Sequence, residues 1–306
     1  MRRHRTIMDG KEPYVNHNAR QDSAGCAVVI TVDVDGDLPF LSLDPEHRSR
    51  LKSRSVGQYG PDHGADRLLA LFHELDVPSS WFVPGLVAKE HPDLVQRIHA
   101  GGADLASHGT AHLDFDGLSL AEQIDEILGG RDALEAITGE AVRGFRIPSG
   151  EWQPGFIQAM TDEGFTWTSS LPADDQPFWL DMEARMLEIP FRYELEDLQY
   201  MGFNLDPPFP PGQSRIASHR TVFDNWSIEF DAAQRWGTMF LLRLNAEIMG
   251  TPGRTALLRR LINRMQAGHA SFTTCAQVRS AMSGTAPDAD HPYQRFQRLA
   301  APAVAS

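Results

Sequence analysis

The stretch CAVVITVDVD, residues 26–35, changes from apolar to acidic within one residue. Its first part is rich in β-branched side chains and carries no charge, which is typical of a strand buried on both faces of a parallel sheet. Asp33 and Asp35 lie at the carboxyl end of this strand. In a parallel barrel, polar groups at that end of the strands are the ones that take part in catalysis. We therefore expect both carboxylates to belong to a functional site.

The rest of the chain alternates strands with helices. Short apolar runs predict further strands at 80–83, 103–107, 144–148, 166–169, 187–191, 239–244 and 270–274, and apolar residues at helical spacing predict helices at 65–76, 92–100, 119–139, 156–164, before Gly237 and at 255–265. Many of the strands lie about 25 to 30 residues apart, which implies parallel βα units. So many units in one chain favour a (β/α) barrel over an open sheet.

The chain divides into one domain with two extensions. Residues 1–25 have no apolar periodicity and predict a flexible N-terminal arm, and residues 26–283 predict the barrel. A long polar loop is expected between the first strand and residue 65. Pro, Asp and aromatic residues dominate at about 172–225, which predicts a lid-like insertion. Residues 284–306 are rich in Ala, Pro and Asp and predict a frayed C-terminal tail.

Composition argues against several classes of function. The formal net charge is −13 and the sequence has no stripe of Lys and Arg, which argues against nucleic-acid binding. No apolar run approaches the ~18 residues that span a bilayer, and the basic start, Met1 to Arg5, is followed by polar residues rather than by the apolar segment of a signal peptide. We therefore expect a cytoplasmic protein with a small-molecule or saccharide substrate and no nucleic-acid or membrane partner. A homo-oligomer is left open.

A pair of histidines follows the predicted strand at 103–107. In the hexapeptide SHGTAH, residues 107–112, His108 and His112 are four positions apart, so that one turn of helix would direct both imidazoles at a single metal ion. The chain contains twelve histidines, so this spacing alone is weak support for a metal site. Its position is stronger support, because the carboxyl ends of the strands meet at one mouth of a barrel. The polar residues expected at that mouth are Asp33, Asp35, His108, His112, Arg146 and Asn245.

These residue types support metal-assisted hydrolysis. Two His and one Asp form the three-ligand set of a catalytic zinc site and leave one position for water. The second Asp is then free to accept a proton from that water, whose pKa the metal lowers towards ~7. The metal also polarises the carbonyl group under attack and stabilises the oxyanion. The sequence therefore indicates hydrolysis of an amide or an ester.

Three motifs occur in the order and spacing of the polysaccharide deacetylase family: DVD at 33–35, SHGTAH at 107–112 and GFRIP at 144–148. The chain resembles most closely the branch that contains peptidoglycan deacetylase-like and allantoinase-like proteins. That branch also carries the motifs found here as VGQYG (56–60), FVPG (82–85) and SSL (169–171) ahead of Asp175. The resemblance spans residues 27–282, which makes the combination specific although each motif alone is weak.

The resemblance implies a fold, a cofactor and a set of roles. The fold is a distorted, incomplete (β/α) barrel with parallel strands, and the cofactor is a divalent metal ion, with zinc as the first choice. Asp35, His108 and His112 would bind this metal, and Asp33 would be the general base. Arg146 would orient Asp33.

The main departure from the family pattern concerns a catalytic position. The family has a histidine on the late strand, usually followed by proline, that protonates the leaving group. Alignment through Gly250, Pro252 and Arg254 puts Asn245 and Ala246 at that position. Asparagine cannot act as an acid and at best donates a hydrogen bond. Three consequences stay open: another acid serves, the leaving group needs no strong acid, or the protein hydrolyses nothing.

Several further residues are candidates for the pocket. His219, in the lid-like segment, and Glu151 are candidate substitutes for the missing acid; for His219 taken alone a solvated loop histidine is the favoured interpretation, and for Glu151 a surface turn is the alternative. Glu194, Glu196 and Asp197 lie where the branch often has an acidic segment near the site, and solvated surface is the alternative. The residues that we expect to contact the substrate are Tyr59, Pro148, Glu151, Trp152 and His219.

The sequence favours a metal-dependent hydrolase of a non-peptide carbon–nitrogen bond, with an N-deacetylase of an amino sugar or small acylated metabolite as the first hypothesis. A ring-opening hydrolase of a cyclic imide or ureide is the second, and a non-catalytic binding relative that has lost its general acid is the third. A two-His, one-carboxylate iron oxygenase uses the same ligand set. The parallel βα pattern and the spare carboxylate of Asp33 argue against it.

Overall fold

The computed structural model describes residues 26–202 and 216–300. The predicted N-terminal arm, 1–25, lies outside the described residues. The strands are β1 (Ala27–Asp33), β2 (Ser80–Val83), β3 (Asp104–Ser107), β4 (Gly144–Phe145), β5 (Trp167–Thr168), β6 (Phe178–Trp179), β7 (Leu187–Glu188), β8 (Phe240–Asn245) and β9 (Ser271–Thr273). They form one sheet in the order β6-β7-β5-β4-β3-β2-β1-β8, with β9 beside β1. β6 pairs antiparallel with β7, and the other printed pairings are parallel.

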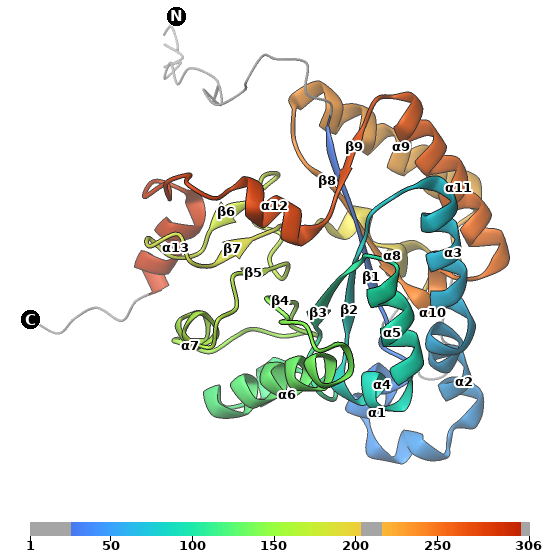
Figure 1. The fold of residues 1–306 in the computed structure, drawn as a ribbon, viewed down its shortest axis with the longest axis horizontal. Helices are drawn as coiled ribbons and strands as arrows, with labels where there is room; N and C mark the ends of the chain where they lie inside the picture. Colours follow the sequence, from blue (N-terminus) through green and yellow to red (C-terminus); the bar gives the residue numbers. More distant parts are fainter. Residues whose placement is uncertain (1–25, 203–215, 301–306) are drawn as a thin grey trace, which may run out of the picture.

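The sheet curls without closing. Its outermost strands in this order, β6 and β8, are not paired with each other among the described residues. Figure 1 shows the consequence: β1, β2, β3 and β8 lie together on one side, and β5, β6 and β7 lie apart from them on the other. The expected distorted, incomplete (β/α) barrel with parallel strands is therefore confirmed.

Helices pack on both faces of the curled sheet, and the helix at 275–281 packs its Cys275 and Val278 against Val29 and Phe82 on the inner face. The helices are α1 (Leu38–Leu43), α2 (Leu51–Tyr59), α3 (Ala65–Leu75), α4 (Gly85–Glu90), α5 (Pro92–Ala100), α6 (Leu120–Thr138), α7 (Phe156–Asp162), α8 (Asp197–Met201), α9 (His219–Trp236), α10 (Ala246–Met249), α11 (Pro252–Ala267), α12 (Cys275–Ala281) and α13 (Pro292–Ala300). α6 matches the helix predicted at 119–139: it starts with a capping box between Ser119 and Glu122 and ends at Gly139 in the left-handed conformation. No helix in the described part of the chain is long and apolar enough to cross a membrane.

The two faces of β1 explain where the polar site lies. Val28, Ile30 and Val32 belong to the apolar core formed with the surrounding helices. Because side chains alternate along a strand, Thr31 and Asp33 point to the opposite face, inside the barrel. Both are fully buried. β1 carries no charge before its last residue, and that residue, Asp33, places its carboxylate in the interior.

The segment between β1 and α3 is not the polar loop that the sequence predicts. It contains α1, a 3-10 helix (Pro45–Ser49), α2 and a π-helix (Gly60–Gly64). Its glycines serve close packing rather than turns: a Cβ added to Gly57 would lie 2.1 Å from the Gly36 carbonyl oxygen, and one added to Gly64 would lie 2.1 Å from that of Ala246. These glycines, which are typical of loops in a sequence, therefore allow the helices to contact neighbouring backbone closely.

Two other boundaries differ from expectation. Helix α13 forms within the predicted frayed tail, 284–306, and Gln294 donates hydrogen bonds to the carbonyl oxygens of Trp179 and Leu180. The predicted lid-like insertion, 172–225, contains β6, β7, α8 and the start of α9, and its residues 203–215 lie outside the described part of the chain. The edge hairpin of β6 and β7 explains why this segment lacks the regular βα spacing.

Candidate active site

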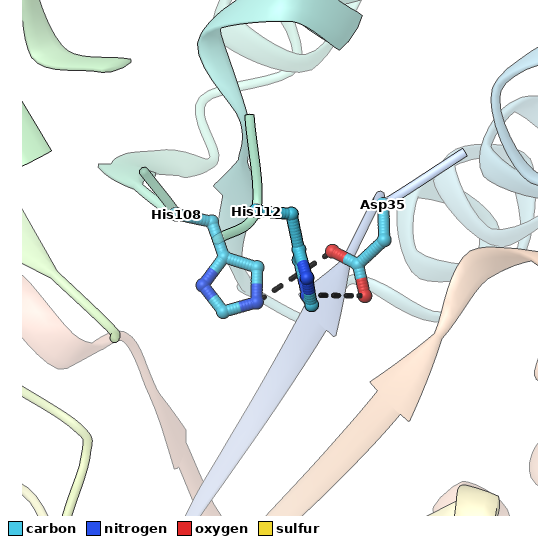
Figure 2. A group of neighbouring side chains, drawn as sticks. All are labelled: Asp35, His108 and His112. Carbon is cyan, nitrogen blue, oxygen red and sulfur yellow. Dashed lines mark ion pairs between the residues drawn. The ribbon is translucent and has the colours of Figure 1, made fainter. Parts of the chain in front are cut away.

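Asp35, His108 and His112 converge at the carboxyl ends of β1 and β3. Each offers one ligand atom, and these atoms lie within 4.8 Å of one another. His108 Nε2 is 3.6 Å from Asp35 Oδ1, and His112 Nε2 is 3.6 Å from Asp35 Oδ2, as the dashed lines in Figure 2 show. The two imidazole planes are nearly perpendicular, at 88°. All three side chains therefore point at one small volume.

The residues present fit a metal ion. Asp35 Oδ1 and His108 Nε2 are buried and make no hydrogen bond within the described residues. Buried polar atoms without a partner are costly, so two that face each other indicate a missing ligand between them. His108 Nδ1 lies 2.9 Å from the Arg146 carbonyl oxygen, which fixes the ring and leaves Nε2 free for a metal. Burial lowers the pKa of His108 to about 4 against the pull of Asp35, so the ring is in its neutral, ligating form.

The backbone between the two histidines is a loop rather than the predicted helical turn. β3 ends at Ser107, and no helix includes residues 108–112. Gly109 has φ +77° and His112 has φ +57°, both in the left-handed region. The spacing of four therefore brings the two rings together through a specific loop conformation, in which His112 adopts a backbone geometry that is uncommon for a residue with a side chain.

Two arginines donate hydrogen bonds to the Asp33 carboxylate. Arg146 Nη1 donates to Asp33 Oδ1 at 2.6 Å, and Arg243 Nε donates to Oδ2 at 2.8 Å. Burial of Asp33 opposes its ionisation, but the charges of Arg146 and Arg243 hold its pKa well below the usual range. His108 Nε2 is 4.0 Å from Asp33 Oδ2, so this ionised carboxylate lies directly beside the triad.

Arg146 is itself held rigidly at the end of β4. Its Nε donates to the Ser169 carbonyl oxygen at 2.7 Å and its Nη2 donates to Ser169 Oγ at 2.8 Å. The guanidinium lies over the Phe82 ring, 3.9 Å from the centroid. These contacts fix the position from which Arg146 orients the Asp33 carboxylate.

Arg243 is a site residue that the sequence analysis missed. It lies on β8, where its Nη1 is 3.4 Å from Glu196 Oε1 in addition to its bond with Asp33. The available signal was an arginine inside the apolar run Phe240–Leu244, since a charge within a buried strand needs a partner. Glu196 is only 2% exposed, so the acidic segment lies in the interior at this point rather than on a solvated surface.

Asn245 ends β8 directly beside Asp33 in the strand register. Its side-chain Nδ2 donates to Asp197 Oδ1 at 2.8 Å, and its backbone N–H lies 2.9 and 3.1 Å from the two carboxylate oxygens. Burial raises the pKa of Asp197 to about 8, although these bonds from Asn245 oppose the shift. The side-chain amide of Asn245 is therefore engaged with a buried carboxyl group.

Glu247 is a second residue near the site that the sequence analysis missed. Its Oε2 atom is buried without a hydrogen-bond partner in the described structure. Burial, and next the charge of Asp35, raise its pKa well above the ordinary value. A Cβ added to Gly60 would lie 3.2 Å from Oε2, so the glycine makes room for this carboxyl group. The sequence alone offers little indication that Glu247 belongs to the site, since a single Glu after a strand is common.

The residues expected to contact substrate lie in different surroundings. Tyr59, at the end of α2, accepts a hydrogen bond from Arg67, and Pro148 is buried after β4. The exposed Glu151 donates its backbone N–H to Asp116, and Trp152 stacks on Phe156 with 6.1 Å between ring centroids. His219 is exposed at the start of α9, with its ring against Gly253. The bonds that the described structure gives these five residues do not reach the triad, so their substrate contacts stay predictions.

This chain is similar to known proteins in sequence and in fold. The profile of the family described as Polysaccharide deacetylase matches residues 58–168. A solved structure from Mycobacterium smegmatis, whose name as a polysaccharide deacetylase is provisional, is 30% identical, with a TM-score of 0.80 over 85% of this chain and 91% of that one. The chain belongs to the polysaccharide deacetylase family.

Two other known proteins are similar to this chain, one in sequence and one in fold. A peptidoglycan deacetylase-like protein of Gibberella zeae is 24% identical over an alignment of 237 positions that covers 69% of each chain. The solved structure of the allantoinase PuuE superposes with a TM-score of 0.74 at 21% identity and covers 87% of this chain and 92% of that one. The second likeness concerns the fold alone.

Proposed function

We propose that this polysaccharide deacetylase family member is a metal-dependent hydrolase of a non-peptide carbon–nitrogen bond, acting first on an N-acetylated amino sugar or a small acylated metabolite. Family membership supports amide hydrolysis, and the name of the Gibberella relative supports an amino sugar. The observation that carries the proposal is the convergence of Asp35, His108 and His112 within 4.8 Å, beside the ionised Asp33.

The triad would hold the metal through one carboxylate oxygen and two imidazole nitrogens, a donor set that suits zinc. Bound there, the ion would polarise the substrate carbonyl and make a water more acidic. Other contacts of the chain already orient these donor atoms. The contact of His108 Nδ1 with the Arg146 carbonyl oxygen directs Nε2 towards Asp35.

Asp33 is the proton acceptor in this proposal. Its two arginines keep it ionised at neutral pH and fix both carboxylate oxygens in place. The same charges make it a weak base, so it accepts a proton only from a group that has itself been made acidic. Weak basicity of Asp33 and a metal that acidifies water are therefore complementary parts of one site.

Asn245 supports a second substrate class, a cyclic imide or ureide whose ring is opened. An amine leaves an amide readily only when an acid protonates it, which a deacetylase must provide. Asn245 cannot provide that proton, and its side-chain amide is bonded to Asp197. The leaving nitrogen of an imide or ureide delocalises its negative charge onto an adjacent carbonyl and needs a weaker acid. Ring opening is therefore our second candidate function.

The test assays both reactions with the Zn²⁺-loaded protein. One arm measures acetate release from N-acetylated chitooligosaccharides, and the other follows ring opening of hydantoin by its ultraviolet absorbance. We expect turnover in one arm and its loss in His112→Ala, because a metal ligand is removed. His73→Ala changes an exposed histidine on α3 and is the matched control. Sugar binding without turnover in either arm would contradict hydrolysis and favour a non-catalytic relative.

A further inference from the structure

Glu126 lies on α6, behind the loop that carries both histidines. Its side chain is buried, with 6% of the residue exposed. A single carboxylate oxygen, Oε1, accepts a hydrogen bond from the Ala111 N–H at 2.8 Å and another from the Leu113 N–H at 3.2 Å. These two N–H groups flank His112. The carboxylate therefore holds the backbone immediately before and after a metal-site histidine.

The conformation of His112 explains why such a hold is needed. Its φ of +57° lies in the left-handed region, which is unfavourable for a residue with a Cβ atom. A conformation of this kind persists only when the surrounding structure fixes it. The two bonds to Glu126 provide that constraint, since a change of His112 to an ordinary backbone angle would reorient at least one of the two N–H groups.

The rest of the loop is anchored to α6 and α4 by other groups. Ser107 Oγ donates to the Ile127 carbonyl oxygen and Thr110 Oγ1 donates to the Glu126 carbonyl oxygen, both at 2.8 Å. From α4, the Gly85 N–H donates to the Gly109 carbonyl oxygen at 2.9 Å. These bonds do not involve the Glu126 side chain. We therefore expect the loop to stay attached to α6 and α4 when the Glu126 side chain is changed. The orientation of the His112 side chain is what the change would alter.

We propose that Glu126 is a positioning residue that sets the affinity of the metal site by holding His112 in its left-handed conformation. The inference rests on the proposed metal-binding role of Asp35, His108 and His112. Glu126 does not contact the metal volume; it acts through the backbone on one ligand. Outer groups that orient a metal ligand change affinity by about 10- to 100-fold when they are removed.

The experiment titrates metal-free protein with Zn²⁺ against a chromophoric chelator. Glu126→Ala removes the acceptor, and we expect its Zn²⁺ affinity to fall at least about 10-fold. Glu126→Gln keeps an oxygen that can accept both N–H groups and is expected within about threefold of the unmodified protein. Glu126→Asp, one methylene shorter, cannot reach both groups and is expected to lose affinity too. If the alanine variant does not fold, the aspartate variant still tests the inference.

Glu135→Ala is the matched control, because Glu135 lies on the same helix and accepts the Val142 N–H at 2.9 Å, away from the triad. A purely structural role for Glu126 would lower the melting temperature in both alanine variants and leave the Zn²⁺ affinity of each unchanged. Unchanged affinity in Glu126→Ala or Glu126→Asp would overturn this inference. Failure of the unmodified protein to bind Zn²⁺ would instead overturn the proposed function, so the two failures are distinguishable.

Discussion

Asn245 and Asp197 form a buried pair in which the asparagine side chain donates to the carboxyl group at 2.8 Å. The pair lies at the end of β8, next to Asp33 in the strand register. Asp197 is fully buried, so the position opposite it is well defined. A carboxyl group that accepts a bond from the side chain of residue 245 is placed to orient an imidazole at the same position.

Asn245→His is therefore expected to increase N-deacetylation. The new ring would donate one N–H to Asp197 and present its other nitrogen as a proton donor. General acids of this kind contribute about 10²- to 10⁴-fold, so a gain of at least about tenfold in kcat for acetate release is expected. Asn245→Gln, which keeps an amide, is the control. An unchanged rate in the histidine variant would show that protonation by this residue does not limit the reaction.

Arg243 is expected to set the acidic limb of the pH profile. Arg243→Met leaves Asp33 with Arg146 alone, so the pKa of Asp33 rises. Because Asp33 must be ionised to accept a proton, the acidic limb of kcat/KM should move to higher pH, by about one to three units. Arg243→Lys keeps the charge and should move the limb less. A limb that stays in place, or moves to lower pH, would argue that Asp33 is not the base.

Asp197 is expected to make stability depend on pH. Its pKa is raised by burial from 3.8 to about 8, against the bonds from Asn245. The unfolded chain releases this proton at lower pH than the folded chain, so the contribution of the neutral carboxyl is full below about pH 4 and is lost as pH rises towards 8. Asp197→Asn mimics the neutral form. Its melting temperature relative to the unmodified protein should therefore rise between pH 5 and pH 8.5, and a constant difference would refute the shifted pKa.

Gly64 is expected to tolerate no side chain. A Cβ there would lie 2.1 Å from the Ala246 carbonyl oxygen, which is backbone and cannot move aside cheaply. Gly64→Ala should cost about 1 to 3 kcal/mol in the free energy of unfolding by urea. Gly117, with nothing within 4 Å of the added atom, is the control, and its alanine variant should change stability by less than about 0.5 kcal/mol. Equal losses in the two variants would contradict close helix packing at Gly64.

Much of the fold could be predicted because the strands carry a strong local signal. The sequence turns from apolar to acidic at Asp33, and polar residues follow β3 and β4. Because parallel strands present their carboxyl ends at one edge, these residues are expected to lie together. That rule predicted the proximity of Asp35 to His108 and His112 without any contact information, and their ligand atoms lie within 4.8 Å.

What could not be predicted depends on contacts between distant segments. The left-handed angle of His112 is held by Glu126 from another element, and helical spacing gave a wrong conformation for this loop. The glycines of α2 and the following π-helix read as loop formers because their role, close approach to the backbone of Gly36 and Ala246, is invisible in one sequence. The role of Arg243 is visible only from its partners, Asp33 on β1 and Glu196 before α8.

The most direct test of the central claim is the metal content of the purified protein after incubation with Zn²⁺ and removal of excess ion, measured alongside His112→Ala. The account predicts close to one Zn²⁺ per chain in the unmodified protein, because Asp35, His108 and His112 form one site. It predicts loss of that ion in the variant. An unmodified protein that retains no metal, or a His112→Ala variant that retains both metal and activity, would contradict it.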